Sequence, residues 1–379
     1  MADGPVRPYP WAVAAVAAAL FVAIRVVLLP SPATTADALD SDFLAFFTAG
    51  SMIADGRMPE LYDLDAQLGD QQALQGPPDD TTVMGFFNPP PFALLVVPFA
   101  GFPAISALQG WRHLWDVAWL GLLLASLRMS RDTATDLAIA AAYVLFPPVV
   151  LARLSGQPVP MMLGGLLGAL AATRARRPEL AGLALALAWV KPHVALILGG
   201  WIAVTQGPRA LAGFAVGTLA WVGASLAMGG WPLLASYADL LAMLARGGTG
   251  YGVKLEHTVT VRGMLSRILG EPPVWLWLPL SALTGVGLLA AARKVPAEAA
   301  IALAAVAVLL ASPHALYHDQ GLILVALLVL GARWVALGIF LAAWVGVVNL
   351  AWWPVIVFGS SVALGVSILI ERAHPPTTG

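Results

Sequence analysis

The sequence predicts an all-α polytopic membrane protein. Its 379 residues are 59% hydrophobic and 11% charged, and the mean hydropathy is +0.82, whereas a soluble domain carries about a quarter charged residues. Apolar runs of about the 20 residues that cross a hydrocarbon core recur from Trp11 to Ile370. These runs leave no room for a separate soluble domain, so we predict a single membrane-embedded domain over residues 1–379.

The acidic residues are concentrated in one stretch of this weakly charged chain. Ten of the 21 acidic residues lie between Asp37 and Asp80, where Arg57 is the single basic residue, although the net charge is only −1. Such a distribution lacks the basic surface that nucleic acid requires, which excludes nucleic acid as a partner. The chain contains no cysteine, which excludes disulfides and thiolate metal sites.

The short basic loops predict the topology, because such loops tend to stay on the cytoplasmic side of a membrane. If all of them face inward, an even number of crossings separates each from the next. The basic places are Arg7; Arg128 and Arg131; Arg174, Arg176 and Arg177; Arg209; Arg293 and Lys294; Arg333; and Arg372.

The first part of the chain offers three apolar stretches, 11–29, 91–103 and 108–127, for two crossings. We predict that 11–29 is a retained transmembrane helix. The middle stretch is short and bracketed by prolines, so we predict that it lies in the outer interface.

The next predicted hairpin places a lysine below the outer surface of the membrane. Two crossings, 179–190 and 193–204, meet at Lys191 and Pro192. A twelve-residue helix rises about 18 Å, against about 30 Å for the hydrocarbon core. A charge at that depth is tolerated in a protein-lined or watery cavity. The alternative is one long helix kinked at Pro192, which would invert every later loop.

The remaining apolar runs complete about twelve crossings with both termini cytoplasmic. Two outer loops are then large, 30–90 and 229–272, and short outer loops fall at 153–158, 312–319 and 352–354. The further crossings are expected over 136–152, 158–173, 209–228, 274–292, 297–311, 319–331, 334–350 and 354–370.

The first outer loop carries candidate carboxylates. Asp42 precedes an apolar pattern with helical spacing over 41–54, which predicts a helix along the membrane that begins at Asp42. An N-cap role for Asp42 remains open. Tyr62 and Asp63 follow a turn at Met58 and Pro59, and a plain polar loop is the alternative there.

The later outer loops add cations and hydrogen-bonding groups. Arg153 and Gln157 join two spans, where they could also serve as helix-end anchors, and the last loop contains His314, His318 and Asp319. A metal site is conceivable from these three side chains. Pro313 and the small number of further ligands favour hydrogen bonding to a phosphate instead.

Carboxylates and cations that converge beside lipid suit transfer from a lipid phosphate. A carboxylate can deprotonate an acceptor hydroxyl while lysine and histidine neutralise the departing phosphate. The alternative is a transporter or flippase for a lipid-linked sugar, which predicts carboxylates throughout the membrane depth and repeat symmetry. In this sequence the carboxylates lie almost wholly in loops.

Several short motifs occur in the order found in glycosyltransferase family 87, which the chain resembles over nearly its whole length. They are Asp42-Phe43 with Phe46-Phe47 and Ala49-Gly50, then Gly56 and Leu61-Tyr62-Asp63, then Pro89-Pro90-Pro91-Phe92 leading to Pro98, then Gly156-Gln157, the stretch from Ala181-Gly182 to Lys191-Pro192, and Ser312-Pro313-His314 through Asp319. The resemblance implies a C-type glycosyltransferase bundle with interfacial helices in the first outer loop. It also implies a polyprenyl-phosphate hexose donor, typically mannose, and no metal or other cofactor.

The resemblance assigns the catalytic aspartate to Asp42 and the later-loop histidine to His318, with His314 as a competitor. We therefore predict an inverting hexosyltransferase at the outer face of a bacterial cytoplasmic membrane, acting on a glycolipid or glycan acceptor. Asp42 is the predicted base. The predicted donor-phosphate ligands are Lys191, His318, His314 and Arg153, and the predicted further substrate contacts are Gln157, Tyr62, Asp63 and Asp319.

Overall fold

The computed structural model describes residues 10–25, 34, 39, 41–75, 83–245, 255–331, 334–348 and 352–373. Within them the backbone is helical apart from loops and one isolated antiparallel bridge between Thr258 and Leu316. The predicted all-α class is confirmed. Asp37, Asp40, Arg7 and Arg333 lie outside the described residues.

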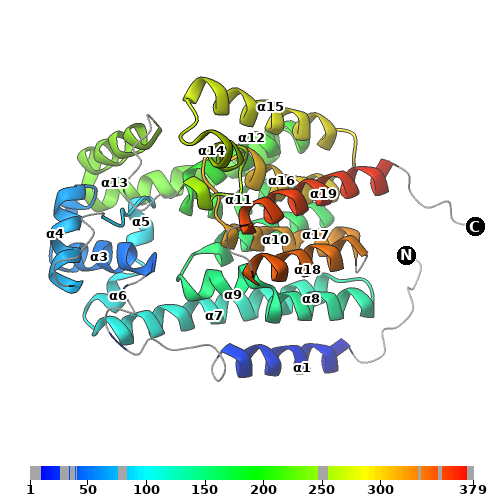
Figure 1. Ribbon diagram of the computed structural model, residues 1–379, viewed down its shortest axis with the longest axis horizontal. Coiled ribbons are helices and arrows are strands. Elements are labelled where there is room, and N and C mark those ends of the chain that lie inside the picture. The colour runs from blue at the N-terminus through cyan, green and yellow to red at the C-terminus, as the bar shows by residue number, and fades with distance from the viewer. Residues whose placement is uncertain are drawn as a thin grey trace, which may run out of the picture.

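Helices of the bundle run side by side along its long axis (Figure 1). Proline begins or interrupts many of them, because it disfavours helix at the residue before it. The bundle helices are α1 (Pro10–Ala23), α7 (Ala104–Met129), α8 (Thr133–Leu145), α9 (Pro147–Leu154), α10 (Val159–Arg174), α11 (Pro178–Leu185) with η3 (Ala186–Val190), α12 (Pro192–Thr205), α13 (Pro208–Ala245), α15 (Val274–Ala292), α16 (Ala297–Ala311), η5 (Tyr317–Ile323) with α17 (Leu324–Leu330), α18 (Trp334–Val348) and α19 (Trp353–Ala373).

Three stretches of the described chain are long and apolar enough to cross a membrane by length and composition. They are Thr133–Leu154, Pro208–Leu244 and Val274–Ala292. Eight further apolar helices have 10–17 residues. These findings support a membrane protein, and the number of about twelve crossings stays a prediction.

One end of the bundle gathers the loops that we predicted to be cytoplasmic. Glu298, at the start of α16, accepts hydrogen bonds from Arg131 at 3.1 Å and from Arg174 at 3.0 Å. Arg174 also donates to the carbonyl of Leu328 near the end of α17, at 2.9 Å. Figure 1 shows α1 beginning and α19 ending at this same right-hand end. The shared end agrees with an even number of crossings between these loops.

The hairpin of α11 and α12 turns at Lys191. Lys191 has an extended backbone (φ −127°, ψ 99°), as expected for a residue before proline. The hydroxyl of Thr173 at the end of α10 lies 3.2 Å from the side-chain oxygen of Gln206 at the end of α12. Because α11 starts and α12 ends at this same end of the bundle, the two helices form an antiparallel hairpin. The alternative of one long kinked helix is therefore wrong.

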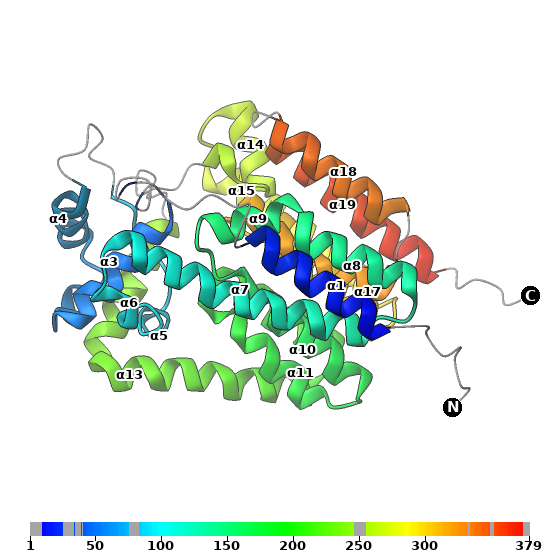
Figure 2. The ribbon, with the colours of Figure 1, turned by 90° about the horizontal axis from the view of Figure 1, so that it is seen from below.

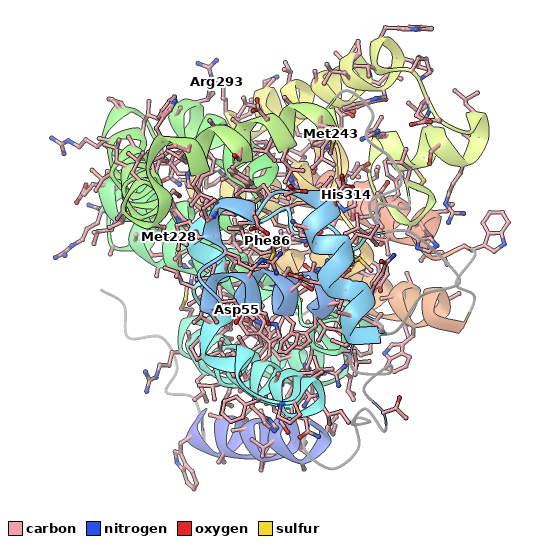
Figure 3. The ribbon with its side chains drawn as sticks, turned by 90° about the vertical axis from the view of Figure 1, so that its left-hand side faces the viewer. Asp55, Phe86, Met228, Met243, Arg293 and His314 are labelled. Carbon is pink, nitrogen blue, oxygen red and sulfur yellow. The ribbon has the colours of Figure 1, made fainter. Side chains whose placement is uncertain are left out.

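The opposite end carries the predicted outer loop, 30–90, and the predicted interfacial stretch, 91–103. Their helices are α3 (Phe43–Ala54), η2 (Met58–Glu60), α4 (Leu64–Gln75), α5 (Pro90–Ala93) and α6 (Val97–Ala100). Figure 3 looks onto this end, with α3 and α4 at its centre. Because α5 and α6 have four residues each, the predicted non-spanning stretch 91–103 is confirmed. The predicted helix over 41–54 is also present, and nine of its twelve residues are buried.

α13 connects the two ends. Figure 2 shows it running beneath α10 and α11 toward α3. It bends where Gly230 adopts φ 65°, ψ −161°, two residues before Pro232. A Cβ on Gly182 of α11 would overlap the carbonyl oxygen of Ala210. The glycine therefore permits the close contact of α11 and α13 that holds the hairpin carrying Lys191.

Candidate active site

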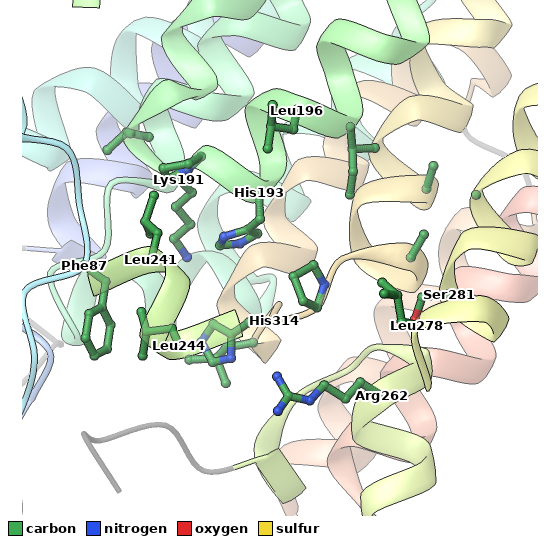
Figure 4. A pocket seen from close by; sticks show the side chains of 18 of the residues that line it. Phe87, Lys191, His193, Leu196, Leu241, Leu244, Arg262, Leu278, Ser281 and His314 are labelled. Atoms are coloured by element: carbon green, nitrogen blue, oxygen red, sulfur yellow. The ribbon is translucent and has the colours of Figure 1, made fainter. Parts of the chain in front are cut away.

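A cavity of about 940 Å³ opens between the loops at the end of the bundle that carries α3 and the helices α12, α15 and α16. Its polar part, the polar chamber, is lined by Asp42, Gln157, Lys191, His193 and His314. Figure 4 shows Lys191 and His193 projecting from one wall and His314 from the facing wall. The cavity thus brings together side chains from the start of α3, the turn before α10, the α11–α12 hairpin and the loop that follows α16.

Asp42 faces the polar chamber and does not cap α3. It occupies the N-cap position with helical backbone angles, and its side chain makes no capping hydrogen bond. Instead, its carboxylate accepts a hydrogen bond from Nε2 of Gln157 at 2.6 Å. Burial raises the pKa of the Asp42 carboxyl, while the Gln157 hydrogen bond and the nearby Lys191 charge act in the opposite direction. A carboxylate with a raised pKa is suited to accept a proton.

Gln157 is held by the turn before it. Gly156 adopts φ +70°, and a Cβ there would lie 3.0 Å from the ring of Trp111. The indole N–H of Trp111 donates to the Gly156 carbonyl at 2.8 Å, and the backbone N–H of Gln157 donates to the Ala152 carbonyl at 2.8 Å. These contacts fix the direction of the Gln157 side chain toward Asp42.

Lys191 forms a buried ion pair at the wall of the polar chamber. Its Nζ lies 2.7 Å from Oδ1 of Asp319 and 3.3 Å from Nε2 of His318. The other Asp319 oxygen accepts the backbone N–H of Leu316 at 3.0 Å, which fixes the carboxylate at the start of η5. His318 and Asp319 are both buried, and neither lines the cavity, so they act on it through Lys191.

His314 faces the cavity directly. Its ring and that of His193 are edge to face, with centroids 6.3 Å apart. Ser312 fixes the loop, since its hydroxyl donates to the His314 carbonyl at 2.8 Å. Burial lowers the pKa of His314 to about 4, so the ring is neutral at pH 7 and can donate or accept a hydrogen bond.

Unpaired polar atoms are concentrated at this cavity. Buried polar atoms are nearly always hydrogen-bonded in folded proteins. Among the described residues, fourteen buried side-chain nitrogen or oxygen atoms have no hydrogen-bond partner. Six of them belong to residues that line the cavity: Gln157, His193, Arg262, Trp277, Ser281 and His314. This concentration indicates a site built to bind a polar ligand.

An apolar groove continues the cavity away from the polar chamber. On α15 its lining runs from Val274 to Leu289, a distance of about 22 Å along the helix axis. The lining residues recur at three- and four-residue spacing, which keeps them on one helix face. The groove is lined by Leu196, Ile197, Gly200, Trp201 and Val204 of α12, by Val274, Trp277, Leu278, Ser281, Ala282, Gly285, Val286 and Leu289 of α15, and by Ala307 and Ala311 of α16.

Besides His318 and Asp319, three more predicted site residues do not line the cavity. Nε of Arg153 donates to the two carboxylate oxygens of Asp116 at 2.8 and 3.0 Å. The Oδ1 atom of Asp63 accepts the backbone N–H groups of Asp65 and Ala66, which caps α4. The third residue is Tyr62. Because these side chains are engaged elsewhere, we assign no substrate contact to them.

Tyr62 supports the site from behind. Its hydroxyl donates to the carbonyl of Asn88 at 2.8 Å, and its ring centroid lies 4.8 Å from that of Tyr237. Asn88 in turn donates to the Val190 carbonyl at 2.8 Å, directly before Lys191, and it lines the cavity. Asn88 thus connects Tyr62 to the backbone directly before Lys191.

Sequence reasoning also missed Arg262. It lies near the start of α14 (Val261–Leu269), in the second large outer loop, and it lines the cavity. The signal in the sequence was the strongly amphipathic pattern of this short helix, which indicates that one of its faces is covered.

One of three comparisons with known proteins found a match. The family model for glycosyltransferase family 87 matches residues 86–313, more than half of the chain. The matched range includes Gln157, Lys191 and Arg262. Searches of curated proteins and of solved structures found no match. The chain therefore belongs to glycosyltransferase family 87.

Proposed function

We propose that this glycosyltransferase takes a hexose, mannose in our proposal, from a polyprenyl-phosphate sugar. The acceptor is a lipid-linked or envelope glycan, and the reaction takes place at the outer face of a bacterial cytoplasmic membrane. The observation that supports this most strongly is the shape of the cavity. A chamber with a carboxylate, an amide and a lysine opens into a long apolar groove.

The groove suits the lipid part of the proposed donor. Its walls are apolar side chains with a single hydroxyl, from Ser281. An isoprenoid chain that moves from the bilayer into the groove would therefore replace apolar contacts with lipid by apolar contacts with protein. The phosphate would then lie near Lys191 and His314, with His318 supporting Lys191. The sugar would lie beside Asp42. The donor would thus be aligned from sugar to lipid along the cavity.

The reaction would proceed by inversion. The acceptor hydroxyl oxygen forms a bond to the anomeric carbon as the bond from that carbon to the phosphate oxygen breaks. The hydroxyl proton passes to the Asp42 carboxylate, and the products are the glycosylated acceptor and a polyprenyl phosphate. Because the leaving phosphate is already stabilised as an anion, a second carboxylic acid is not needed, unlike in a glycosidase.

The proposed function is tested by measuring sugar transfer in membranes that contain the protein. We expect labelled hexose to move from synthetic polyprenyl-phosphate mannose into membrane glycans, and we expect a nucleotide sugar not to replace the donor once endogenous polyprenyl phosphate is removed. Transfer from the nucleotide sugar alone would contradict the proposed donor class.

Gly285 provides a test of the groove. A phenylalanine there would project between α15 and α16, where a Cβ already meets Ala311 at 3.3 Å. We expect Gly285→Phe to raise the KM for a long-chain donor at least tenfold and to change the KM for a two-isoprene donor less than threefold.

Gly287 on the same helix is the matched control, because a Cβ there meets nothing within 4 Å and the residue is exposed. Gly287→Phe should leave both KM values unchanged. An equal loss for short and long donors in Gly285→Phe would show that the groove does not hold the lipid.

A further inference from the structure

The polar chamber needs a cation beyond Lys191 if it is to hold an anionic donor. Lys191 is 2.7 Å from Asp319, so its charge is already compensated. Asp42 adds a second carboxylate to the same region, and His314 is neutral at pH 7 because burial lowers its pKa to about 4. One ammonium group therefore faces two carboxylates. The resulting net negative charge would repel a phosphate.

Arg262 is a cavity-lining cation. Among the side chains that the structure describes, no carboxylate forms an ion pair with its guanidinium, and Glu271 acts on it only at longer range. Its Nε is buried and has no hydrogen-bond partner. The guanidinium carbon lies 4.7 Å from the ring centroid of Trp277. An arginine whose guanidinium lies over an indole ring can still donate its N–H groups to a phosphate.

The fold attaches Arg262 to the loop that carries His314. The amide of Val259 donates to the carbonyl of Ala315 at 2.8 Å, beside the bridge between Thr258 and Leu316. Thr260 then caps α14 by accepting the N–H of Gly263 at 3.1 Å. These bonds place the first turn of α14 against the loop that lines the cavity.

Gly263 is what allows this approach. A Cβ at Gly263 would overlap Oγ1 of Thr258. The backbone position of Arg262 relative to the loop of His314 is therefore determined by these contacts.

Arg262 lies at the border between the polar chamber and the apolar groove. Figure 4 shows Arg262 below His314, with Leu278 and Ser281 of α15 beside it and Lys191 on the opposite wall. We propose that Arg262 binds the phosphate of the lipid donor at this border, opposite Lys191. This inference rests on the proposed function, and it makes Arg262 a substrate-binding residue that sets the preference for a phosphorylated lipid.

The test compares the binding of farnesyl phosphate and farnesol to the purified protein in detergent. Wild-type protein is expected to bind the phosphate more tightly than the alcohol. R262Q should reduce that preference at least tenfold, whereas R262K should retain most of it because the charge remains. G263A should also weaken the preference, since it displaces the first turn of α14.

R267Q is the matched control, because Arg267 is an exposed arginine of the same helix that does not line the cavity. It should leave the preference unchanged and should match R262Q in thermal stability. A preference that survives in R262Q, or is missing in the wild type, would overturn the role of Arg262. A preference lost in R262Q without any transfer from polyprenyl-phosphate mannose by the wild type would count against the proposed reaction alone.

Discussion

Asp42→Asn is expected to reduce glycosyl transfer by at least a hundredfold while leaving donor binding nearly unchanged. The substitution keeps an oxygen that can accept the Gln157 hydrogen bond, which is 2.6 Å long in the wild type. It removes the group that would take the acceptor proton, and general-base catalysis of this kind contributes about 10²–10⁴ in rate. The measurement is kcat for transfer of labelled sugar, together with the Kd for the donor.

Asp65→Asn is the matched control for this prediction. Asp65 lies on α4 in the same outer loop, is exposed, and does not line the cavity. We expect wild-type kcat in this variant. If Asp42→Asn retained wild-type turnover, Asp42 could not be the base.

The pH profile is a second readout for Asp42. Burial raises the pKa of its carboxyl, so the proton-accepting carboxylate form is lost at a higher pH than for an ordinary aspartate, whose pKa is about 3.9. The acid limb of kcat/KM should therefore lie above about pH 4, with activity falling as the pH decreases through it. Asp42→Asn should remove this limb from the residual activity.

Lys191→Met is expected to inactivate the enzyme and also to destabilise it. The substitution leaves the Asp319 carboxylate, whose side chain is 1% exposed, without its ammonium partner. Removing one member of a buried ion pair costs about 3–5 kcal/mol. We expect a lower thermal midpoint in detergent and loss of transfer, because the phosphate also loses a cation.

The double variant Lys191→Met with Asp319→Leu separates the two effects. Replacing both members of a buried pair by apolar groups is often neutral for stability, so the thermal midpoint should recover toward that of the wild type. Transfer should stay absent. Recovery of activity together with stability would show that Lys191 has only a structural role.

The prediction for Lys191 shows how far the sequence could be taken. A basic residue at the meeting point of two short apolar runs, followed by proline, was sufficient to predict a helix break below the outer surface. The helix break is present at Lys191, and its depth below the outer surface stays a prediction. Its partner Asp319 could not be inferred, because the pairing depends on how the turn between η3 and α12 meets η5, which periodicity does not record.

Arg153 shows the opposite outcome. Its position in a short outer loop suggested a phosphate ligand, yet the structure pairs it with Asp116 of α7. In the sequence, Asp116 lies within an apolar run and carries no sign of its partner. A charged side chain that faces a substrate and one that neutralises a neighbouring helix have the same sequence environment, so only the packing distinguishes them.

The sequence by itself determined the membrane class, the helical fold, the family resemblance, and the supply of reactive groups in the outer loops. These properties follow from local preferences, namely apolar transfer, helix length and the restrictions of proline. The tertiary structure alone decided which of these groups share one cavity. It joined Asp42 to Gln157 and placed Arg262 opposite Lys191, because such pairings arise from packing between segments that are far apart in the chain.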